Sequence, residues 1–313
     1  MNEIFDLISK SKSILLLSHE NPDGDAIGSV MAFYYMLSDM KKNVIAVFPK
    51  VPDDMLFLDS TNKIASSSED TFDLGIIFDC SNEARVGQTN NELSRCKVKI
   101  VIDHHKFNTK YGDVNYIDEN VSSCCQIIYS MFDEWNIKIN NQIGEALCTG
   151  VITDTNGLSN SNVDKNTFLL MAKFLELGID VHRIYYLTLL QKTLPQHKLM
   201  KLAYDNLEFY DDGKIAFVYI SKEDMASVQA KFGDHEGIVD IGRNIHGVEV
   251  SVFMYERDNS YYVSLRSNGL VKVNTIACKF GGGGHDLAAG IKFDGDFKET
   301  KKMLIDEIIK ELS

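Results

Sequence analysis

The sequence predicts an α/β protein of two domains, the first a parallel sheet with helices on both faces and the second a smaller mixed sheet. Largely apolar runs at 14–17, 74–78 and 99–102 are typical of strands buried on both faces. Later strand-like segments, such as 215–220 and 261–265, include period-two alternation, which favours a sheet with one exposed face. The length of 313 residues exceeds the roughly 250 at which single cores stop growing.

The first half of the chain alternates predicted strands and helices. A short amphipathic helix precedes the strand at 14–17, and Ile27, Val30, Tyr34 and Leu37 then fall at helical spacing. The next strands are expected at 44–48, 74–78 and 99–102, and further helices at 124–135, 142–152 and 165–177. This order is typical of a parallel sheet whose strands are connected by helices.

The second half has a different pattern. Residues 182–210 have a helical pattern, with Pro195 at a break or first turn, so we expect domains at 1–187 and 211–313 and a helical linker at 188–210. Strands are expected at 215–220, 248–255 and 261–265, a helix at 274–280, and a closing helix whose apolar face includes Leu304, Ile308 and Leu312.

Polar side chains follow three of the predicted strands, at the point where each strand ends. Because the carboxyl ends of parallel strands meet at one edge of a sheet, we expect these residues to lie close together. Imidazole and carboxylate are ligands of divalent metals, and their number suits two ions about 3.5 to 4 Å apart. The alternative for the first loop is a solvated turn in which Asp25 caps a helix. The residues are His19, Asp23, Asp25, Asp79, Asp103, His104 and His105, with Asp154 at the end of a helix.

Charge and composition narrow the functional classes. The net charge of −13 argues against gripping a long nucleic acid, but it is compatible with a short phosphate ester. The N-terminus lacks the order of a signal peptide and no apolar run approaches 18 residues, so we expect a cytoplasmic protein without a membrane partner. The six cysteines have no C-x-x-C spacing, which indicates neither a disulfide framework nor a zinc knuckle.

Four motifs in order resemble the DHH phosphoesterases. They are SHENPDGDAIGS at 18–29, DCS at 79–81, DHH at 103–105 and GVITDT at 150–155. The stretches SLRS at 264–267 and GGGGHDLAAG at 281–290 are similar to the associated substrate-binding domain of the nanoRNase branch. The resemblance implies a parallel-sheet catalytic domain and a hydrolase that degrades very short oligonucleotides and dephosphorylates 3′-phosphoadenosine 5′-phosphate (pAp).

The resemblance also implies roles for the polar residues. His19 and Asp23 would hold one ion, Asp25, His104 and Asp154 the other, and Asp79 would bridge both. Asp103 would orient His104, and His105 would approach the scissile phosphate. The mixed ligand set favours Mn²⁺, with Mg²⁺ or Co²⁺ as alternatives. Two ions of this kind activate water and stabilise charge during in-line displacement.

In the second domain the resemblance implies a grip on the substrate. Arg266 and His285 would hold a phosphate or base, with Arg243 and Asn274 as weaker candidates. Gly282, Gly283 and Gly284 would let backbone amides approach the ligand, because no Cβ intervenes. Outside the resemblance, the glycine run could form a flexible turn and Arg266 could lie on the surface.

The leading hypothesis is a metal-dependent phosphodiesterase that converts short single-stranded RNA or DNA oligonucleotides to mononucleotides and also acts on pAp. A linear or cyclic dinucleotide phosphodiesterase is an alternative within the same chemistry. A non-catalytic nucleotide-binding regulator is the alternative from another class, although every expected metal ligand is present. A second copy of the chain, forming a homodimer, is a candidate partner.

Overall fold

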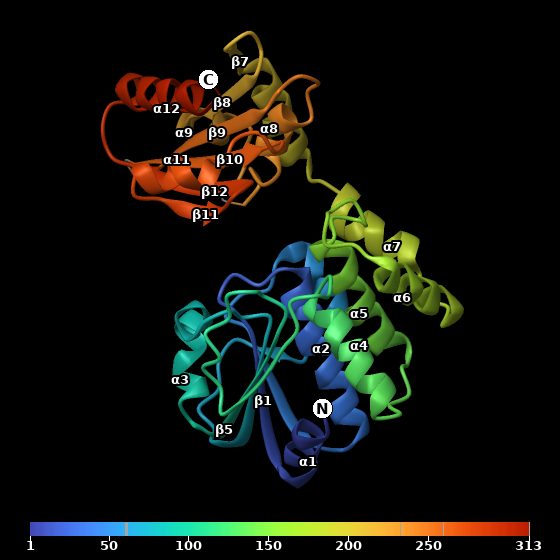
Figure 1. The fold of residues 1–313 in the computed structure, drawn as a ribbon. Helices are drawn as coiled ribbons and strands as arrows, with labels where there is room; N and C mark the ends of the chain where they lie inside the picture. Colours follow the sequence, from blue (N-terminus) through green and yellow to red (C-terminus); the bar gives the residue numbers. More distant parts are fainter. Residues whose placement is uncertain (60–61, 232, 259, 313) are drawn as a thin grey trace. The chain divides into compact units, whose positions relative to one another are not determined.

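The computed structural model describes residues 1–59, 62–231, 233–258 and 260–312, which group into two compact units. The first unit is Met1–Gln191 and the second is Lys192–Ser313 (Figure 1). Each unit contains one sheet with helices packed on it, so the predicted α/β class is confirmed. None of the helices in the described residues is long and apolar enough to cross a membrane.

The sheet of the first unit is parallel throughout. Its strand order is β3-β2-β1-β4-β5-β6, and every neighbouring pair runs in the same direction. Because β1 lies beside β4 and β4 beside β5, the ends of the three most apolar strands are adjacent. The strands are β1 (Ser13–Leu17), β2 (Asn43–Val47), β3 (Ile64–Ala65), β4 (Phe72–Phe78), β5 (Cys96–Asp103) and β6 (Val114–Ile117).

Helices cover both faces of this sheet, as the sequence predicts. The larger core joins alternate strand residues such as Leu16 and Ile76 to helices that include α2 and α5. The smaller core joins Leu15 and Ile77 to two short helices on the other face. The helices of the larger core are α1 (Asn2–Lys10), α2 (Gly24–Asp39), α4 (Cys124–Glu134), α5 (Asn141–Asp154), α6 (Lys165–Glu176) and α7 (Val181–Tyr185), and the other face has η2 (Glu83–Thr89) and α3 (Asn90–Leu93).

The helices α2 and α5 approach each other closely because glycine occupies the contact. A Cβ on Gly28 would lie 2.4 Å from the carbonyl oxygen of Ala146, and one on Gly24 would lie 2.4 Å from Oγ1 of Thr153. Both distances are too short for any side chain, so these positions require glycine. The close packing brings the first turn of α2 to the end of α5, where two of the predicted ligands lie.

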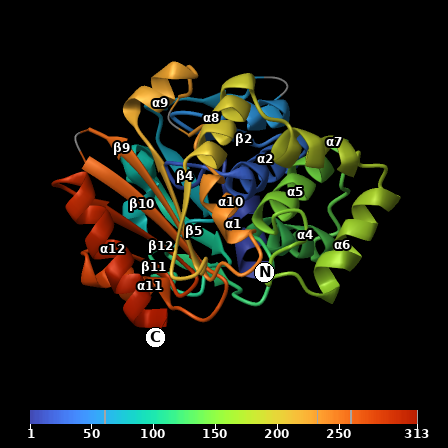
Figure 2. The ribbon, with the colours of Figure 1, turned by 90° about the horizontal axis from the view of Figure 1, so that it is seen from above.

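The second unit has a mixed sheet with the order β11-β12-β10-β9-β8-β7, in which only β8 and β9 run parallel. In Figure 2, α11 and α12 lie along one side of its strands. The strands are β7 (Leu207–Tyr210), β8 (Ile215–Ile220), β9 (Val250–Arg257), β10 (Ser260–Ser267), β11 (Gly283–His285) and β12 (Ala288–Phe293). The helices are α8 (Leu194–Asp205), α9 (Lys222–Ser227), α10 (Ile238–Arg243), α11 (Val273–Lys279) and α12 (Phe297–Leu312).

The segment 188–210, expected to be a helical linker, contains more than helix. It begins within the short helix η3 (Tyr186–Leu190), continues into α8 and ends in strand β7. Leu207–Tyr210 is extended because it pairs antiparallel with Ile215–Ile220 and so completes the edge of the second sheet. The remaining short helix, η1 (Asp53–Asp59), lies in the first unit.

Candidate metal centre

The eight polar residues expected at the sheet edge all lie there. His19 follows β1, Asp79 follows β4 directly, and Asp103 is the last residue of β5, with His104 and His105 next in the chain. Asp23 and Asp25 lie at the start of α2, and Asp154 is the last residue of α5. The carboxyl edge of the parallel sheet therefore gathers ligands from three strands and two helices.

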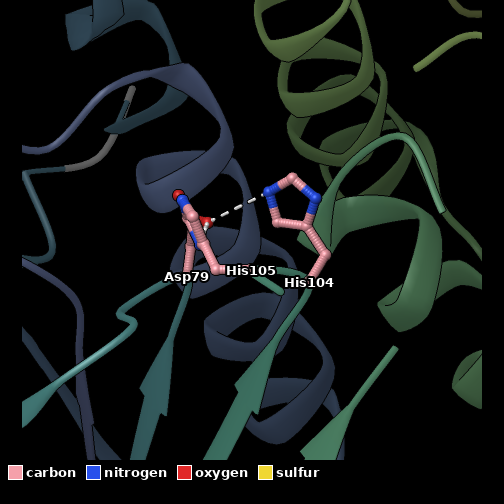
Figure 3. Close-up of side chains that lie close together, drawn as sticks. All are labelled: Asp79, His104 and His105. Atoms are coloured by element: carbon pink, nitrogen blue, oxygen red, sulfur yellow. Dashed lines mark ion pairs between the residues drawn. The ribbon is translucent and has the colours of Figure 1, made fainter. Parts of the chain in front are cut away.

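These side chains form three overlapping groups in which every ligand atom lies within 4.8 Å of the others. The groups are His19 with Asp23 and Asp79, Asp25 with His104 and Asp154, and Asp79 with His104 and His105. Asp79 belongs to two of them, and its two carboxylate oxygens are divided. Oδ2 lies 3.7 Å from Nε2 of His19, whereas Oδ1 lies 3.5 Å from Nε2 of His104 (Figure 3).

His104 lies at the centre of the second group. Its Nε2 is 3.9 Å from Oδ2 of Asp25 and 3.7 Å from Oδ2 of Asp154. Each of these distances exceeds a hydrogen bond, and a cation that lies between the atoms would contact both. The arrangement matches the division of ligands that the family resemblance implies.

Asp23 and Asp25 both accept backbone N–H groups, but the donors belong to different helices. Oδ1 of Asp23 accepts the backbone N–H groups of Asp25 and Ala26, so Asp23 is the N-cap of α2. The carboxylate of Asp25 instead accepts the backbone N–H groups of Cys124 and Cys125, at 2.6 and 2.9 Å. Asp25 therefore lies at the N-terminus of α4, where the helix dipole favours a negative charge.

Asp79 is the most constrained of the carboxylates. It is 3% exposed, and its φ of 50° lies in the left-handed region that residues other than glycine rarely adopt. Oδ1 is buried without a hydrogen-bond partner among the described residues. A buried carboxylate oxygen without a donor is costly, and a cation at this point would satisfy it. The donor set and this orphaned oxygen both fit a bound divalent metal.

Burial and mutual repulsion shift the pKa values of the carboxylates. Burial, reinforced by the charge of Asp79, raises the pKa of Asp25 well above its ordinary value. Burial also raises the pKa of Asp154 to about 7. For Asp79, burial acts to raise the pKa, but the nearby imidazoles of His104 and His19 outweigh it and lower the pKa. The centre thus concentrates negative charge that the histidine side chains around it only partly compensate.

Asp103 contacts the backbone of His104, which the resemblance expects it to orient, and also the ring of His105. Its Oδ1 lies 2.7 Å from Nδ1 of His105 and also accepts the backbone N–H of His104. Its Oδ2 accepts the side-chain amide of Asn108, which also donates to the carbonyl of Cys80. Asp103 therefore orients the ring of His105, and the hydrogen bond raises the pKa of that histidine. Sequence reasoning missed Asn108, although its position three residues after His105 is a short-range signal.

In the second unit, strand register aligns the predicted substrate residues. His285 pairs with Ala288, and Ala288 pairs with Arg266, so the three share one row across β11, β12 and β10. Directly paired residues point to the same face of a sheet, which puts His285 and Arg266 on one face. Arg266 also lines a pocket of about 300 Å³ together with His235, Glu236, Gly237, Val239, Phe253 and Ser264. The sequence offered no sign that His235 lies beside Arg266.

The other predicted substrate residues lie elsewhere or have packing roles. Arg243 ends α10 and contacts Asn268 and Asp240, and Asn274 lies in the first turn of α11. Gly283 belongs to the same face as Arg266 through its pair Gly290. A Cβ on Gly282 or Gly284 would collide with the backbone of β12, so close packing against this strand also requires glycine at both positions.

Comparisons with known proteins find relatives that cover most of this chain. The NrnA protein of Bacillus subtilis, named a bifunctional oligoribonuclease and PAP phosphatase, is 28% identical over 92% of this chain and 91% of its own. An exopolyphosphatase-related protein from Bacteroides fragilis has a TM-score of 0.91 at 25% identity, over 99% of this chain and 95% of that one. The Mn²⁺ complex of RecJ from Thermus thermophilus has a TM-score of 0.54 at 13% identity, over 98% of this chain and 54% of that one.

Two family models divide the chain in the same way as the fold. Residues 13–151 match the N-terminal domain of the DHH family, and residues 200–313 match the DHHA1 domain. The first match lies in the unit with the metal centre, and the second lies in the unit with Arg266. The resemblance predicted from the motifs is confirmed, and the chain belongs to the DHH family, with a DHHA1 domain after its N-terminal domain.

Proposed function

We propose that this chain is a divalent-metal-dependent phosphodiesterase that hydrolyses short oligonucleotides to mononucleotides and removes the 3′-phosphate of pAp. The observation that carries the proposal is the pair of ligand groups joined by Asp79. Two cation sites that share one carboxylate are typical of enzymes that hydrolyse phosphate esters. The name of the Bacillus subtilis relative supports oligoribonucleotides and pAp as the substrates.

Two ions fit the residues of the centre. His19, Asp23 and Asp79 would hold one, and Asp25, His104, Asp154 and Asp79 would hold the other. When bound, the pair of cations activates a water and stabilises the charge that develops on the phosphoryl oxygens. We propose Mn²⁺ because mixed imidazole and carboxylate ligands suit it and because the RecJ relative binds Mn²⁺.

The protein's own groups complete the chemistry. Nδ1 of His105 is held by Asp103, so Nε2 is the ring nitrogen that remains for a substrate oxygen. Because the hydrogen bond to Asp103 raises its pKa, His105 is more readily protonated and can donate a hydrogen bond to the phosphate. Asn108 holds the second oxygen of Asp103 and so keeps the carboxylate in the plane that His105 needs.

Short substrates fit the charge distribution. The net charge of −13 leaves little of the extended basic surface that a long nucleic acid requires. Arg266 and His285 share one face of the second sheet and supply a local grip on one nucleotide. A separate grip of this kind orients a small substrate, and orientation supplies a large part of such rate enhancement.

The test uses metal-stripped full-length protein that is given Mn²⁺ and four substrates. These are a 5′-phosphorylated dinucleotide, pAp, a cyclic dinucleotide and a single-stranded 20-mer. We expect the dinucleotide to be hydrolysed fastest, pAp to lose its 3′-phosphate, and the 20-mer to react slowest. Hydrolysis of none of them would favour the non-catalytic regulator. Preference for the cyclic dinucleotide or for the 20-mer would replace the proposed substrate class.

A further inference from the structure

On one face of the second sheet, α10 packs on β8 and β9 and reaches β10, whereas no helix of the described residues packs on β12 on that face. The side chains of β10 and β12 that point away from α11 and α12 lie on this face, and we call this part of it the open face. On β10 these are Tyr262, Ser264 and Arg266. They are half-buried, and Lys292 and Gly290 beside them on β12 are exposed. The opposite face buries residues such as Val263 and Leu265 in the core.

Strand register arranges the open face in three rows. The first row contains His285, Ala288 and Arg266, of which His285 and Arg266 are proposed to hold the substrate. The second row contains the small residues Gly283, Gly290 and Ser264 on β11, β12 and β10, and it ends at Phe253 on β9. The third row contains Lys292, Tyr262 and Tyr255. On β10 the small Ser264 lies between Arg266 and Tyr262, and with Gly290 and Gly283 it forms a shallow trough that ends at Phe253.

Tyr262 is held in place in the third row. Its ring stacks beside that of Tyr255, its cross-strand partner, at a centroid distance of 5.5 Å and an interplanar angle of 19°. Nζ of Lys292 lies 5.8 Å from the ring centroid, and the guanidinium of Arg257 lies 6.0 Å from it. A fixed, half-buried aromatic ring on an open sheet face is the arrangement on which unpaired bases stack.

The charge of the open face is opposite to that of the chain. Arg266 and Lys292 share it with Arg257, which is paired with Asp258 in the following turn, and none of the described strand residues on this face is a carboxylate. Within the described part of the chain, neither Arg266 nor Lys292 has an ion pair, although Glu236 lines the pocket beside Arg266. In a protein with a net charge of −13, such a local excess of cations complements a phosphate backbone.

We propose that Tyr262 is a stacking platform for a second base of a short single-stranded oligonucleotide, and that Lys292 contacts the adjoining phosphate. The strand crosses the trough from the row of Arg266 and His285 to the row of Tyr262. Arg266 lies four positions after Tyr262 on the extended strand, a span of roughly 13 Å. A base and its own phosphate lie closer together than that, so the two rows hold different nucleotides. This inference rests on the proposed function, which it extends to substrate length.

The test measures binding by full-length protein in EDTA, where hydrolysis does not complicate the result. The probes are pAp, which has one base, and a 5′-phosphorylated trinucleotide. Tyr262→Ala should raise the dissociation constant of the trinucleotide roughly 5- to 100-fold, because stacking contributes about 1 to 3 kcal/mol per base. The same change should leave the dissociation constant of pAp within about twofold, because a single nucleotide on Arg266 does not reach the ring.

Three variants and two further ligands define the controls. Tyr262→Phe keeps the ring and should bind the trinucleotide as the wild type does. Tyr204→Ala removes an exposed tyrosine of α8 and should change neither ligand. Lys292→Gln should weaken trinucleotide binding and reduce its dependence on salt. The two further ligands are trinucleotides with one abasic residue, at the 5′ end in one and at the 3′ end in the other. The trinucleotide that lacks the base stacked on Tyr262 should bind the wild type and Tyr262→Ala equally.

The outcomes separate this inference from the proposed function. An equal loss for pAp and the trinucleotide, or no loss for either, would overturn the platform while leaving the hydrolase intact. Weak binding by Tyr262→Phe would also overturn it, because the ring alone would then not explain the effect. If the wild type neither binds nor hydrolyses any oligonucleotide, the proposed function fails as well. Thermal melting of each variant shows whether the fold is retained.

Discussion

The two units present their candidate binding residues in opposite ways. At the carboxyl edge of the first sheet the ligands are crowded and, apart from Asp23, buried or half-buried, and some are tied to the backbone, as Asp25 is by two N–H groups of α4. On the open face of the second sheet the residues are spread over three strands, and Lys292 is exposed. The first site is rigid before anything binds, whereas much of the second meets solvent.

This difference follows from what each site must do. Metal ligands must be held to within about half an ångström, which requires buried side chains with supporting hydrogen bonds. Residues that grip a flexible strand tolerate adjustment, so long exposed cations and an aromatic ring are sufficient. Substitutions of the ligands at the first site should therefore abolish turnover, and substitutions of the binding residues on the open face should change affinity.

The largest expected effect is that of Asp79→Asn. The change keeps the shape of the side chain but removes the charge shared by both ligand groups. We expect kcat/KM for a dinucleotide to fall by roughly 10³-fold, as when one charge-stabilising group is removed from an active site. The measurement is steady-state hydrolysis in saturating Mn²⁺, with product analysis.

Asp73→Asn is the matched control, because Asp73 lies at the opposite end of the same strand. It pairs with Lys97 at the surface, and an exposed pair of this kind contributes little to stability. Activity should stay within about twofold of the wild type. Comparable losses in the two variants would mean that Asp79 acts through the stability of β4 and not through the centre.

Addition of Mn²⁺ to metal-free protein should stabilise the first unit alone. Ligand at 100 times its dissociation constant contributes about 2.7 kcal/mol, which for a unit of this size raises Tm by roughly 5 to 10 °C. The only tryptophan, Trp135, packs against Phe33 in the first core, so its fluorescence reports that unit. An equal shift in both units, or an undiminished shift in Asp79→Asn, would contradict the assigned ligands.

The sequence predicts the first unit better than the second. The strands β1, β4 and β5 are recognisable because each is a run of buried residues that ends in a charged or imidazole side chain. The two residues of β3 are too few to produce a pattern. In the second unit four successive glycines give no strand pattern, yet Gly283–His285 pairs with β12 as a strand. Leu207–Tyr210 is extended only because β8 lies beside it.

Prediction of the candidate site from the sequence is also limited for physical reasons. Motif spacing brings Asp103, His104 and His105 to the centre. The direction in which each imidazole ring points depends on the backbone conformation, so the sequence does not show which of the two adjacent histidines Asp103 contacts. The structure therefore was needed to find that Asp103 contacts the ring of His105. The rows of the open face depend on pairing between strands, and pairing between Tyr262 and Lys292 leaves no trace in either segment alone.

The smallest expected effect is a change in KM, and it distinguishes two arginines of the second unit. Arg266 lies on the open face without an ion pair among the described residues, whereas Arg243 already contacts Asn268 and Asp240. Arg266→Ala should raise KM for a dinucleotide about tenfold or more, because a hydrogen bond to a charged group contributes about 1.5 to 3 kcal/mol. Its kcat should change by less than about threefold.

Arg243→Ala should leave KM within about twofold, because its guanidinium contacts protein groups and lies outside the row of His285. Both constants come from the same initial-rate series, so a general loss of folded protein would lower kcat in parallel and be recognised. A larger rise in KM for Arg243→Ala than for Arg266→Ala would move the grip from the open face to the end of α10. A fall in kcat alone for Arg266→Ala would instead make that residue part of the chemistry, and the contrast between a rigid catalytic edge and an adaptable binding face would no longer hold.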